Sequence, residues 1–577
     1  MSLTPPARLD LSMNRRAFLA LSAISPLARF LPAFANDPKH AHELKADVCV
    51  VGGGVGGVAA ALAAARGGAS VVLTEEFDWV GGQLTSQAVP PDEHPWIEDR
   101  GCTKLYRRFR DGVRGYYSKH YPLSETAKKA KFLNPGNGSV SKLCHEPRVA
   151  VAVLLELLAP WITKGRVRLL QPHRVTTADV AGDAVKSVGV KNLHTGHVTT
   201  IQARYFLDAT ELGDLLPLAK VEHVTGAEAK KDTGEPAAKE QAEPDNHQAF
   251  TCCFAVSHHP GEDHTIPKPA DYAFWEAYVP KMTPAWPGKL LSWQMSQHND
   301  PAKIRKVDFN PTGPTPNGVL NLWTYRRIVD RANFADEKLA DVCLVNWPQN
   351  DYWLGNLFGK DADKHLAGGK QLSLSLLHWM QTAAPRPDGK TGWPGLKLRH
   401  DIVGTDDGLA MAAYVRESRR IAAEFTVAEQ HVGTDAREKA TGKKRGEFAA
   451  EAFADTVGVG SYRIDLHPSS GGDNYIDVSS LPFQIPLGCL IPKRVENLLA
   501  AGKNVGTTHI TNGAFRLHPV EWNIGEAAGA VAAWCVANKL TPKGVRADAN
   551  KRKDFQDQLT KDGVELEWPA DVAVKAR

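Results

Sequence analysis

Several features that would point to other classes of protein are missing from this sequence. None of the eight cysteines forms a Cys-x-x-Cys pair, which argues against a thioredoxin-like site and a zinc ribbon. No internal period of 20–50 residues is present, so we do not expect a solenoid or a propeller. The formal net charge of the 577 residues is only +4, and residues 1–35 supply most of it. We therefore expect no nucleic-acid partner, and nothing in the sequence indicates a metal site.

The apolar run near the N-terminus is too short and too interrupted to span a membrane. Residues 17–35 contain two prolines and an arginine, whereas a spanning helix needs about 20 continuous apolar residues. Arg15 and Arg16 precede this run, and Ala33-Phe34-Ala35 ends it with the small residues that a signal peptidase requires. This order resembles a twin-arginine export signal, and the alternative is an amphipathic N-terminal helix. We expect a periplasmic or secreted protein whose mature chain has no integral membrane segment.

A glycine-rich turn lies between a predicted strand that ends at residue 51 and a predicted alanine-rich helix that ends near residue 66. Its glycines follow the pattern Gly52-x-Gly54-x-x-Gly57, and a second strand ends at Glu75. Gly52 permits the tight turn, Gly54 leaves room for a pyrophosphate, and Gly57 allows close packing of helix on strand. Glu75 can accept hydrogen bonds from ribose hydroxyls, which argues against a 2′-phosphate. The pattern predicts a dinucleotide site, and the alternative is a glycine turn without a ligand.

Two distant segments favour FAD over NAD as the dinucleotide. Residues 204–214 read as a strand that ends at Asp208, and residues 495–506 read as a strand that runs into Gly502. A helix is predicted from about Asn523. With the Gly81-Gly82-Gln83 turn, these segments resemble the FAD-dependent oxidoreductase family with the glutathione-reductase-like flavin fold, and its exported bacterial branch in particular. The resemblance assigns the cofactor to Gly52, Gly54, Gly57, Glu75, Gly82, Gln83, Asp208, Gly502, Asn523, Gly525 and Ala527.

The resemblance also implies the fold and the domain organisation. We expect an α/β protein with a Rossmann-like FAD-binding domain, assembled from separate segments, and an inserted substrate domain with a mixed sheet and helices. The expected segments are 1–35 for the signal peptide, 45–225 and 485–540 for the FAD-binding domain, 226–484 for the substrate domain, and 541–577 for a C-terminal tail.

Candidate catalytic residues lie in the loop from 509 to 519, just before the predicted C-terminal helix. This loop contains His509, Arg516 and His518. We expect His518 to be the general base, because an imidazole titrates near neutral pH, and Arg516 to hold an anionic group or the flavin O2. His467 is the second candidate base, since it shares one face of a predicted strand with Asp465. For each residue the alternative is a structural polar group.

These observations predict an enzyme, an FAD-dependent oxidase or dehydrogenase. It would oxidise a small polar organic substrate, such as a sugar or a hydroxy acid, by hydride transfer to flavin N5. Without a second glycine fingerprint or a redox dithiol, its electrons would pass to oxygen, a quinone or a soluble carrier. Alternatives are a reductase of an unsaturated acid, a non-catalytic cofactor- or carbohydrate-binding protein, and an NAD-dependent dehydrogenase. We also expect residues 346–352 in the substrate cleft, and a further hypothesis places covalent flavin attachment at His94.

Overall fold

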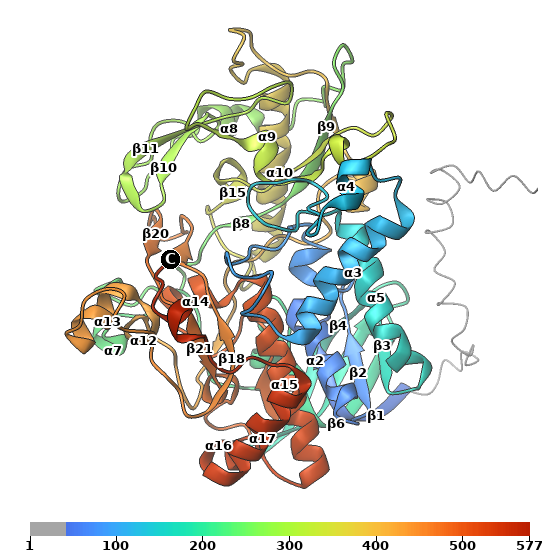
Figure 1. Ribbon diagram of the computed structural model, residues 1–577, viewed down its shortest axis with the longest axis vertical. Helices are drawn as coiled ribbons and strands as arrows, with labels where there is room; N and C mark the ends of the chain where they lie inside the picture. Colours follow the sequence, from blue (N-terminus) through green and yellow to red (C-terminus); the bar gives the residue numbers. More distant parts are fainter. Residues whose placement is uncertain (1–41) are drawn as a thin grey trace, which may run out of the picture. The chain divides into compact units, whose positions relative to one another are not determined.

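A computed structural model describes residues 42–577 of the protein (Figure 1). The predicted export signal lies outside these residues. Within them, no helix is long and apolar enough to cross a membrane. All eight cysteines are among the described residues, and each is buried and free.

A seven-stranded sheet is built from the N-terminal segments and one C-terminal strand. Its order is β3-β2-β1-β6-β5-β4, and β22 adds to β6. The strands β1, β2 and β3 are parallel, as are β6 and β22, whereas β4, β5 and β6 form an antiparallel meander. Near-continuous apolar runs in β1 and β2 suit strands that are buried on both faces. The bounds are β1 His42–Val51, β2 Val71–Thr74, β3 Val167–Leu170, β4 His173–Ala181, β5 Ala184–Asn192, β6 Val198–Asp208 and β22 Leu498–Ala500.

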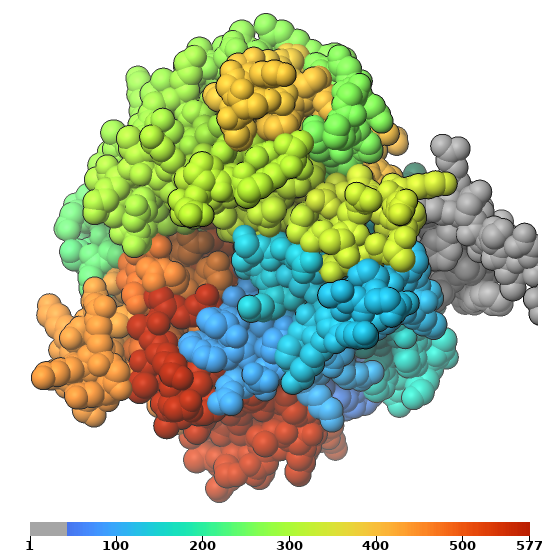
Figure 2. All heavy atoms as spheres, turned by 45° about the horizontal axis from the view of Figure 1, so that its top comes forward, coloured from blue at the N-terminus to red at the C-terminus, as the bar shows by residue number. Residues whose placement is uncertain are grey.

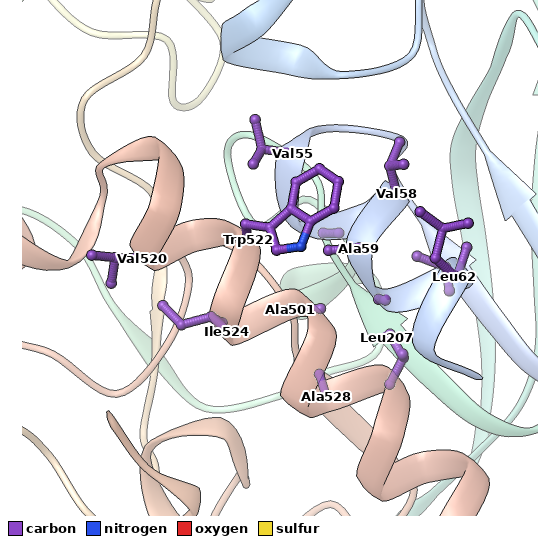
Figure 3. Packing of buried hydrophobic residues seen from close by; sticks show 14 of the residues in the cluster. Val55, Val58, Ala59, Leu62, Leu207, Ala501, Val520, Trp522, Ile524 and Ala528 are labelled. Atoms are coloured by element: carbon purple, nitrogen blue, oxygen red, sulfur yellow. The ribbon is translucent and has the colours of Figure 1, made fainter. Parts of the chain in front are cut away.

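Two helices from opposite ends of the chain cross on this sheet so closely that their backbones are in contact. They are α2 (Val55–Arg66) and α15 (His518–Asn538), whose apolar side chains pack together in Figure 3. A Cβ on Gly525 would lie only 2.0 Å from the carbonyl oxygen of Gly56, and a Cβ on Gly529 would lie 2.1 Å from that of Ala60. Figure 2 also shows the N-terminal and C-terminal segments side by side. The glycines of α15 therefore make the crossing possible.

The start of α15 differs from the sequence-based expectation. We predicted a helix from about Asn523, but α15 begins at His518 with Pro519 in its first turn. A proline suits this position, because the first N–H groups of a helix have no intrahelical partner and the fixed proline φ matches the helix. The predicted loop from 509 to 519 is consequently wrong: residues 509–515 form the helix α14 (His509–Phe515), and His518 is the first residue of α15.

A second hydrophobic core, rich in tryptophan, forms around the middle of the chain. Its four-stranded antiparallel sheet has the order β13-β14-β9-β16 and packs with the long helix α10 (Ala362–Thr382). The buried indoles include those of Trp323, Trp347 and Trp393. The strand bounds are β9 Phe254–His258, β13 Arg327–Val329, β14 Val342–Val345 and β16 Leu396–Leu398, and a three-stranded sheet comprises β10 Gln294–Gln297, β11 Asp300–Asp308 and β12 Leu320–Asn321.

Short two-stranded pairs contribute side chains to one or the other of these cores. Their bounds are β8 Phe250–Thr251 with β15 Asp351–Tyr352, β19 Ile464–Leu466 with β20 Ile476–Val478, β18 Thr456–Gly460 with β21 Phe483–Pro486, and β7 His223–Val224 with β17 Arg420–Ile421. Other helices are α3 Lys104–His120, α4 Glu125–Lys129, α5 Pro147–Thr163, α6 Leu215–Leu218, α7 Lys230–Thr233, α8 Tyr272–Ala277, α9 Leu322–Tyr325, α11 His400–Val403, α12 Glu429–Val432, α13 Thr434–Thr441 and α14 His509–Phe515.

The segment 541–577 contributes to the folded part of the molecule. It forms α16 (Pro542–Ala547), α17 (Ala549–Asp562) and α18 (Ala570–Ala573), and α15 packs against α16 and α17. The side chains of Phe555 and Leu559 are fully buried.

Candidate active site

A cavity of about 560 Å³ opens at the carboxyl ends of β1, β2 and β6. Three segments that directly follow these strands line it, namely residues 51–54, 74–77 and 209–212. In parallel α/β sheets this edge is where ligands bind. Residues 410–413 and side chains of α10 line it from the other core. The cavity therefore lies between the glycine turn and the tryptophan-rich core.

The first part of this cavity has the features that a dinucleotide requires. Glu75 is buried, and its carboxylate accepts hydrogen bonds from the N–H of Gly53 at 3.0 Å and of Phe77 at 2.8 Å. Burial raises the pKa of Glu75 to about 8. Gly52 has φ +96°, and a Cβ at this position would meet the backbone of Ala209 at 2.5 Å. Only glycine fits this turn, and the Glu75 carboxylate stands where ribose hydroxyls could donate to it.

A second carboxylate, which the sequence analysis missed, reaches the glycine turns. Glu211 follows β6, and its Oε1 has no hydrogen-bond partner among the described residues. A Cβ on Gly54 would lie 2.9 Å from this oxygen, and one on Gly82 would lie 2.5 Å from it. The other oxygen forms an ion pair with Lys503, which is buried and lies 3.5 Å from Glu521. Gln83 donates a hydrogen bond to the same Glu521 carboxylate.

The predicted cofactor residues separate into two groups. Gly52, Gly54, Glu75 and Gly82 line the cavity. The others lie behind it in structural contacts. The side chain of Asp208 accepts from Thr210, the amide of Asn523 donates to the carbonyl of Val457 at 3.4 Å, and a Cβ on Gly57 would meet the carbonyl oxygen of Gly52 at 1.9 Å. Gln83, Gly502, Gly525 and Ala527 also lie outside the cavity lining, and Asp208, Gln83, Asn523 and Ala527 are buried.

His518, the first candidate base, is completely buried at the start of α15. Its Nδ1 accepts a hydrogen bond from the backbone N–H of Asp92 at 3.1 Å. Because Nδ1 is the acceptor, the proton of the neutral ring is on Nε2, which has no partner in the part of the chain that the structure describes. Burial lowers the pKa of His518 to about 3. The ring is therefore a neutral donor rather than a free proton acceptor.

His509 is held in a buried ion-pair network. Its Nδ1 lies 2.9 Å from Glu417, and Arg420 binds the same carboxylate. Although burial acts to lower it, the Glu417 carboxylate raises the pKa of His509. His509 does not line the main cavity. This geometry favours the charged form of His509 and joins it to the Glu417–Arg420 ion pair.

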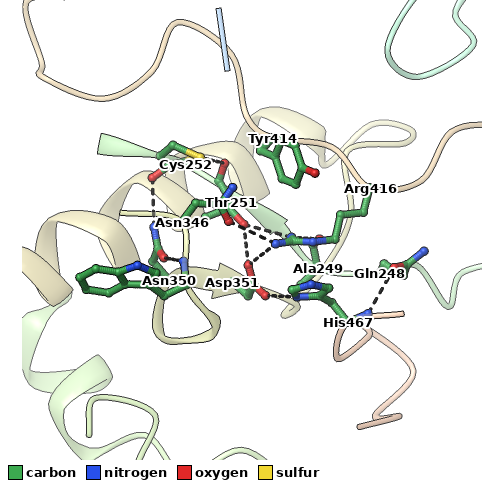
Figure 4. A network of polar contacts seen from close by, with 12 residues as sticks. Gln248, Ala249, Thr251, Cys252, Asn346, Asn350, Asp351, Tyr414, Arg416 and His467 are labelled. Carbon is green, nitrogen blue, oxygen red and sulfur yellow. Dashed lines mark hydrogen bonds and ion pairs between the residues drawn. The ribbon is translucent and has the colours of Figure 1, made fainter. Parts of the chain in front are cut away.

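His467 belongs to a different arrangement, which Figure 4 shows. Its imidazole contacts a buried carboxylate, and a guanidinium group contacts the same carboxylate. Nδ1 of His467 lies 2.6 Å from Asp351, and the same carboxylate is 2.9 Å from Arg416. Arg416 also donates to the carbonyl of Ala249 at 2.8 Å. Burial acts to raise the pKa of Asp351, but Arg416 and His467 hold it at about 2. Asp351 is therefore ionised and fixes the orientation of the imidazole.

A second ion pair completes this group. Arg516 lies 3.5 Å from the Asp465 carboxylate and donates to the Asp465 carbonyl at 3.1 Å, and Asp465 is 3.8 Å from Nε2 of His467. We refer to Asp351, Arg416, Asp465, His467 and Arg516 as the polar cluster. The side chains of Asp465 and His467 keep 18% and 15% of their surface exposed, so that solvent reaches them.

The polar cluster adjoins the far end of the dinucleotide cavity. Val415 lines the cavity, and the hydroxyl of the preceding Tyr414 contacts Arg516 at 3.3 Å. Gln83, in the second glycine turn, donates to the carbonyl of Arg516 at 3.0 Å. Hydrogen bonds therefore connect the polar cluster with the second glycine turn.

Sequence reasoning found part of this site. It singled out His467, Arg516 and the segment 346–352, from which Asp351 and Asn346 enter the site. Arg416, which it did not single out as a candidate site residue, pairs with Asp351, and Glu521 lies beside Lys503. His94 lies outside the cavity lining, and its Nε2 is 3.0 Å from the carbonyl of Gly101.

Comparison with known proteins identifies a family for most of the chain. The family model described as FAD dependent oxidoreductase matches residues 47–559. No curated protein sequence matches.

Similar solved structures share little sequence with this chain. A variant of the E. coli quinol fumarate reductase FrdA is 12% identical, with 90% of this chain and 75% of that chain covered and a TM-score of 0.32. Glycerol-3-phosphate dehydrogenase from Bacillus halodurans, complexed with FAD, is 14% identical over 37% of this chain and 40% of that chain, with a TM-score of 0.22. L-proline dehydrogenase from P. horikoshii is 15% identical over 33% of this chain and 25% of that chain, with a TM-score of 0.17. The chain spans less than half the length of the latter two proteins.

Proposed function

The chain belongs to the FAD-dependent oxidoreductase family, and on that basis we propose that it oxidises a hydroxyl group of a small polar organic substrate, with His467 as general base. It is an enzyme of this family, and FAD is its cofactor. The observation that carries the proposal is the partly exposed His467, oriented by the ionised Asp351 in the polar cluster. This cluster lies outside the cavity lining but is joined to the second glycine turn by the hydrogen bond from Gln83 to Arg516.

The residues around the cavity suit FAD. Gly52 and Gly54 leave the backbone open to a diphosphate, the carboxylate of Glu75 can accept ribose hydroxyls, and Gly82 lines the cavity opposite the first turn. Bound FAD supplies the two-electron oxidant by accepting a hydride from the substrate carbon. All other steps fall to the protein side chains.

His467 has the geometry of a general base. When its Nδ1–H donates to Asp351, its Nε2 is free to accept the proton of a substrate hydroxyl. The imidazolium that forms is stabilised by Asp351 and by Asp465, whose carboxylate is 3.8 Å from Nε2. The predicted base His518 is the competing candidate, but its acceptor nitrogen is already occupied by the N–H of Asp92.

Anaerobic flavin reduction tests this assignment. The holoenzyme and its His467→Asn and His518→Asn variants are mixed with sugars and polyols, and flavin bleaching is followed. We expect H467N to retain its flavin spectrum and to reduce flavin at least about 100-fold more slowly than the parent, the range of a lost general base. H518N is expected to reduce flavin at a rate closer to that of the parent. The opposite order would transfer the role of base to His518, and reoxidation of reduced flavin by fumarate would favour the reductase alternative.

We further propose that the mature protein works outside the cytoplasm and passes its electrons to oxygen, a quinone or a soluble carrier. The paired Arg15 and Arg16 ahead of the apolar run support export by the twin-arginine route. Replacement of both arginines by lysine is expected to keep the FAD-loaded protein in the cytoplasm. Unchanged export of that variant would contradict the proposal.

A further inference from the structure

Buried polar side-chain atoms without a hydrogen-bond partner among the described residues lie in and around the polar cluster. Buried side-chain atoms of Gln248, His298, Asn346, Arg416 and Tyr475 have no partner within residues 42–577. They are Nε2 of Gln248 and His298, Nδ2 of Asn346, Nε of Arg416 and the hydroxyl of Tyr475. A buried polar group without a partner is costly, so water or a ligand must serve these atoms.

These atoms converge on His467 rather than being scattered. The Gln248 side chain accepts from the backbone N–H of His467 at 3.2 Å, and the Asn346 side chain accepts from Arg416 at 3.4 Å. The rings of His467 and Tyr475 are 5.6 Å apart, and those of Tyr475 and His298 are 4.2 Å apart. Because amide and guanidinium N–H groups only donate, the matching ligand is rich in oxygen acceptors.

Charge separates the two oxygen-rich classes of ligand, hydroxyl compounds and carboxylates. Within the polar cluster, Arg416 faces Asp351 at 2.9 Å and Arg516 faces Asp465 at 3.5 Å. The neighbouring pair, Arg326 with Asp92, is 3.2 Å apart and mostly buried. Each guanidinium thus already has a carboxylate. A substrate carboxylate would add an uncompensated negative charge to a buried site, which is unfavourable.

We propose that the site takes an uncharged polyhydroxylated substrate, a sugar or polyol, and discriminates against the corresponding acid. Hydroxyl groups accept from the spare donors and donate to Asp465, the carboxylate of the cluster that keeps exposed surface, without disturbing the charge balance. The half-buried Arg305 on β11 lies close enough to His298 to affect its charge, and it is not counted among the three arginine–aspartate pairs above. The inference rests on the proposed function for its chemistry. One C–H gives its hydride to the bound FAD, the O–H proton goes to His467, and the substrate leaves as a carbonyl compound.

Matched pairs of neutral and acidic ligands test the proposal on the holoenzyme. The pairs are glycerol with glycerate, erythritol with erythronate, and glucitol with gluconate. Binding is measured as a change in the visible flavin spectrum, and oxidation as anaerobic bleaching. We expect the neutral member of at least one pair to have a dissociation constant at least about tenfold lower than that of its acid.

The variant Asp465→Asn sharpens the test, because it leaves Arg516 without its carboxylate. It is expected to bind the acids about tenfold more tightly than the parent does and the polyols with little change. The matched control is Asp477→Asn, because Asp477 lies opposite Asp465 in the same hairpin but pairs with Arg463. This control is expected to leave the preference unchanged.

The outcomes separate the proposal from the proposed function. Tighter binding of the acids by the parent would indicate that Arg305 binds the substrate carboxylate, and it would overturn the proposed substrate class. A flavin spectrum that responds to no member of any pair would also overturn the substrate class. Bleaching by acids alone would keep the oxidation and overturn the class. Binding of polyols without bleaching would keep the class and overturn the oxidation. If D465N lost its flavin, the paired titrations of the parent would decide.

Discussion

Single side chains set the electrostatics of the cofactor site. The Glu211 oxygen that has no partner within residues 42–577 lies against Gly54 and Gly82, where the glycine pattern places the diphosphate of the cofactor. A carboxylate at this point opposes two phosphate charges, and Lys503 is its buried counter-ion. The balance between these charges therefore tunes the affinity for FAD.

Glu211→Gln is expected to increase the FAD affinity of the apoprotein. Removal of one negative charge next to a diphosphate is worth on the order of 1 kcal/mol, about a tenfold change in the dissociation constant. Lys503 keeps Glu521 as a neighbour at 3.5 Å, so the lysine is not left alone. Quenching of flavin fluorescence during titration of apoprotein measures the effect. Riboflavin, which lacks the diphosphate, is the control and should bind both proteins equally.

Weaker binding of FAD by E211Q would contradict this prediction and would mean that Glu211 accepts a hydrogen bond from the cofactor. Lys503→Met is expected to act in the opposite direction, because it leaves Glu211 uncompensated beside the phosphates. If the two variants shift the FAD dissociation constant in opposite directions and leave that of riboflavin unchanged, the effect arises from the charge next to the diphosphate.

At the scale of single elements, the crossing of α2 and α15 holds the glycine turn in place. The two helices come from segments far apart in the sequence and touch through Gly56 and Gly525, where no side chain can be accommodated. Since α2 directly follows the first glycine turn, any displacement of α15 moves the N-terminus of α2 and with it the cofactor site.

Gly525→Ala is expected to destabilise the protein and to weaken FAD binding. Its Cβ would lie 2.0 Å from the Gly56 carbonyl oxygen, and overpacking of this kind costs about 1–3 kcal/mol. Thermal unfolding and an FAD titration measure the two effects. The matched control is Gly115→Ala in α3, where a Cβ meets nothing within 4 Å. That variant should gain about 0.5–1 kcal/mol, because glycine weakens a helix interior. Equal melting temperatures for both variants would contradict the importance of the crossing.

Local elements were predictable where their signal is contiguous in the sequence. The glycine turn, its helix and the following strand appear as expected, with α2 ending at Arg66 and β2 at Thr74. By contrast, Asp351 lies on β15, which pairs with β8, whereas His467 directly follows β19, which pairs with β20. Because β19 ends at Leu466, the predicted strand face shared by Asp465 and His467 is wrong. No periodicity links such segments, so their 2.6 Å contact follows only from the tertiary fold. The boundaries proposed for the FAD-binding and substrate domains stay predictions for the same reason.

At the scale of the whole molecule, buried acids couple the stability of the protein to pH. Burial raises the pKa of Glu75 to about 8 and that of Glu235 to about 7, from a usual value near 4.5. Glu75 lines the cofactor cavity, whereas Glu235 contacts Thr508 and the backbone of Glu429 away from it. A comparison of the two residues therefore distinguishes how cofactor binding and burial alone affect the pH dependence of stability.

The apoprotein is expected to lose stability as the pH rises from about 6.5 to 8, where the histidines of the unfolded chain are already largely neutral, so that buried neutral histidines such as His518 contribute little to the pH dependence. The unfolded chain has released its carboxyl protons near pH 4.5, whereas Glu235 and Glu75 retain theirs to about pH 7 and 8. Raising the pH therefore lowers the free energy of the unfolded state relative to that of the folded state. Melting temperatures across the window measure the loss. Glu235→Gln should reduce the loss in apoprotein and holoprotein alike. Glu75→Gln should reduce it chiefly in apoprotein, because ribose hydroxyls that donate to Glu75 favour its charged form and lower its pKa. A loss that is the same in both variants and the parent would show that neither acid is protonated in the folded state.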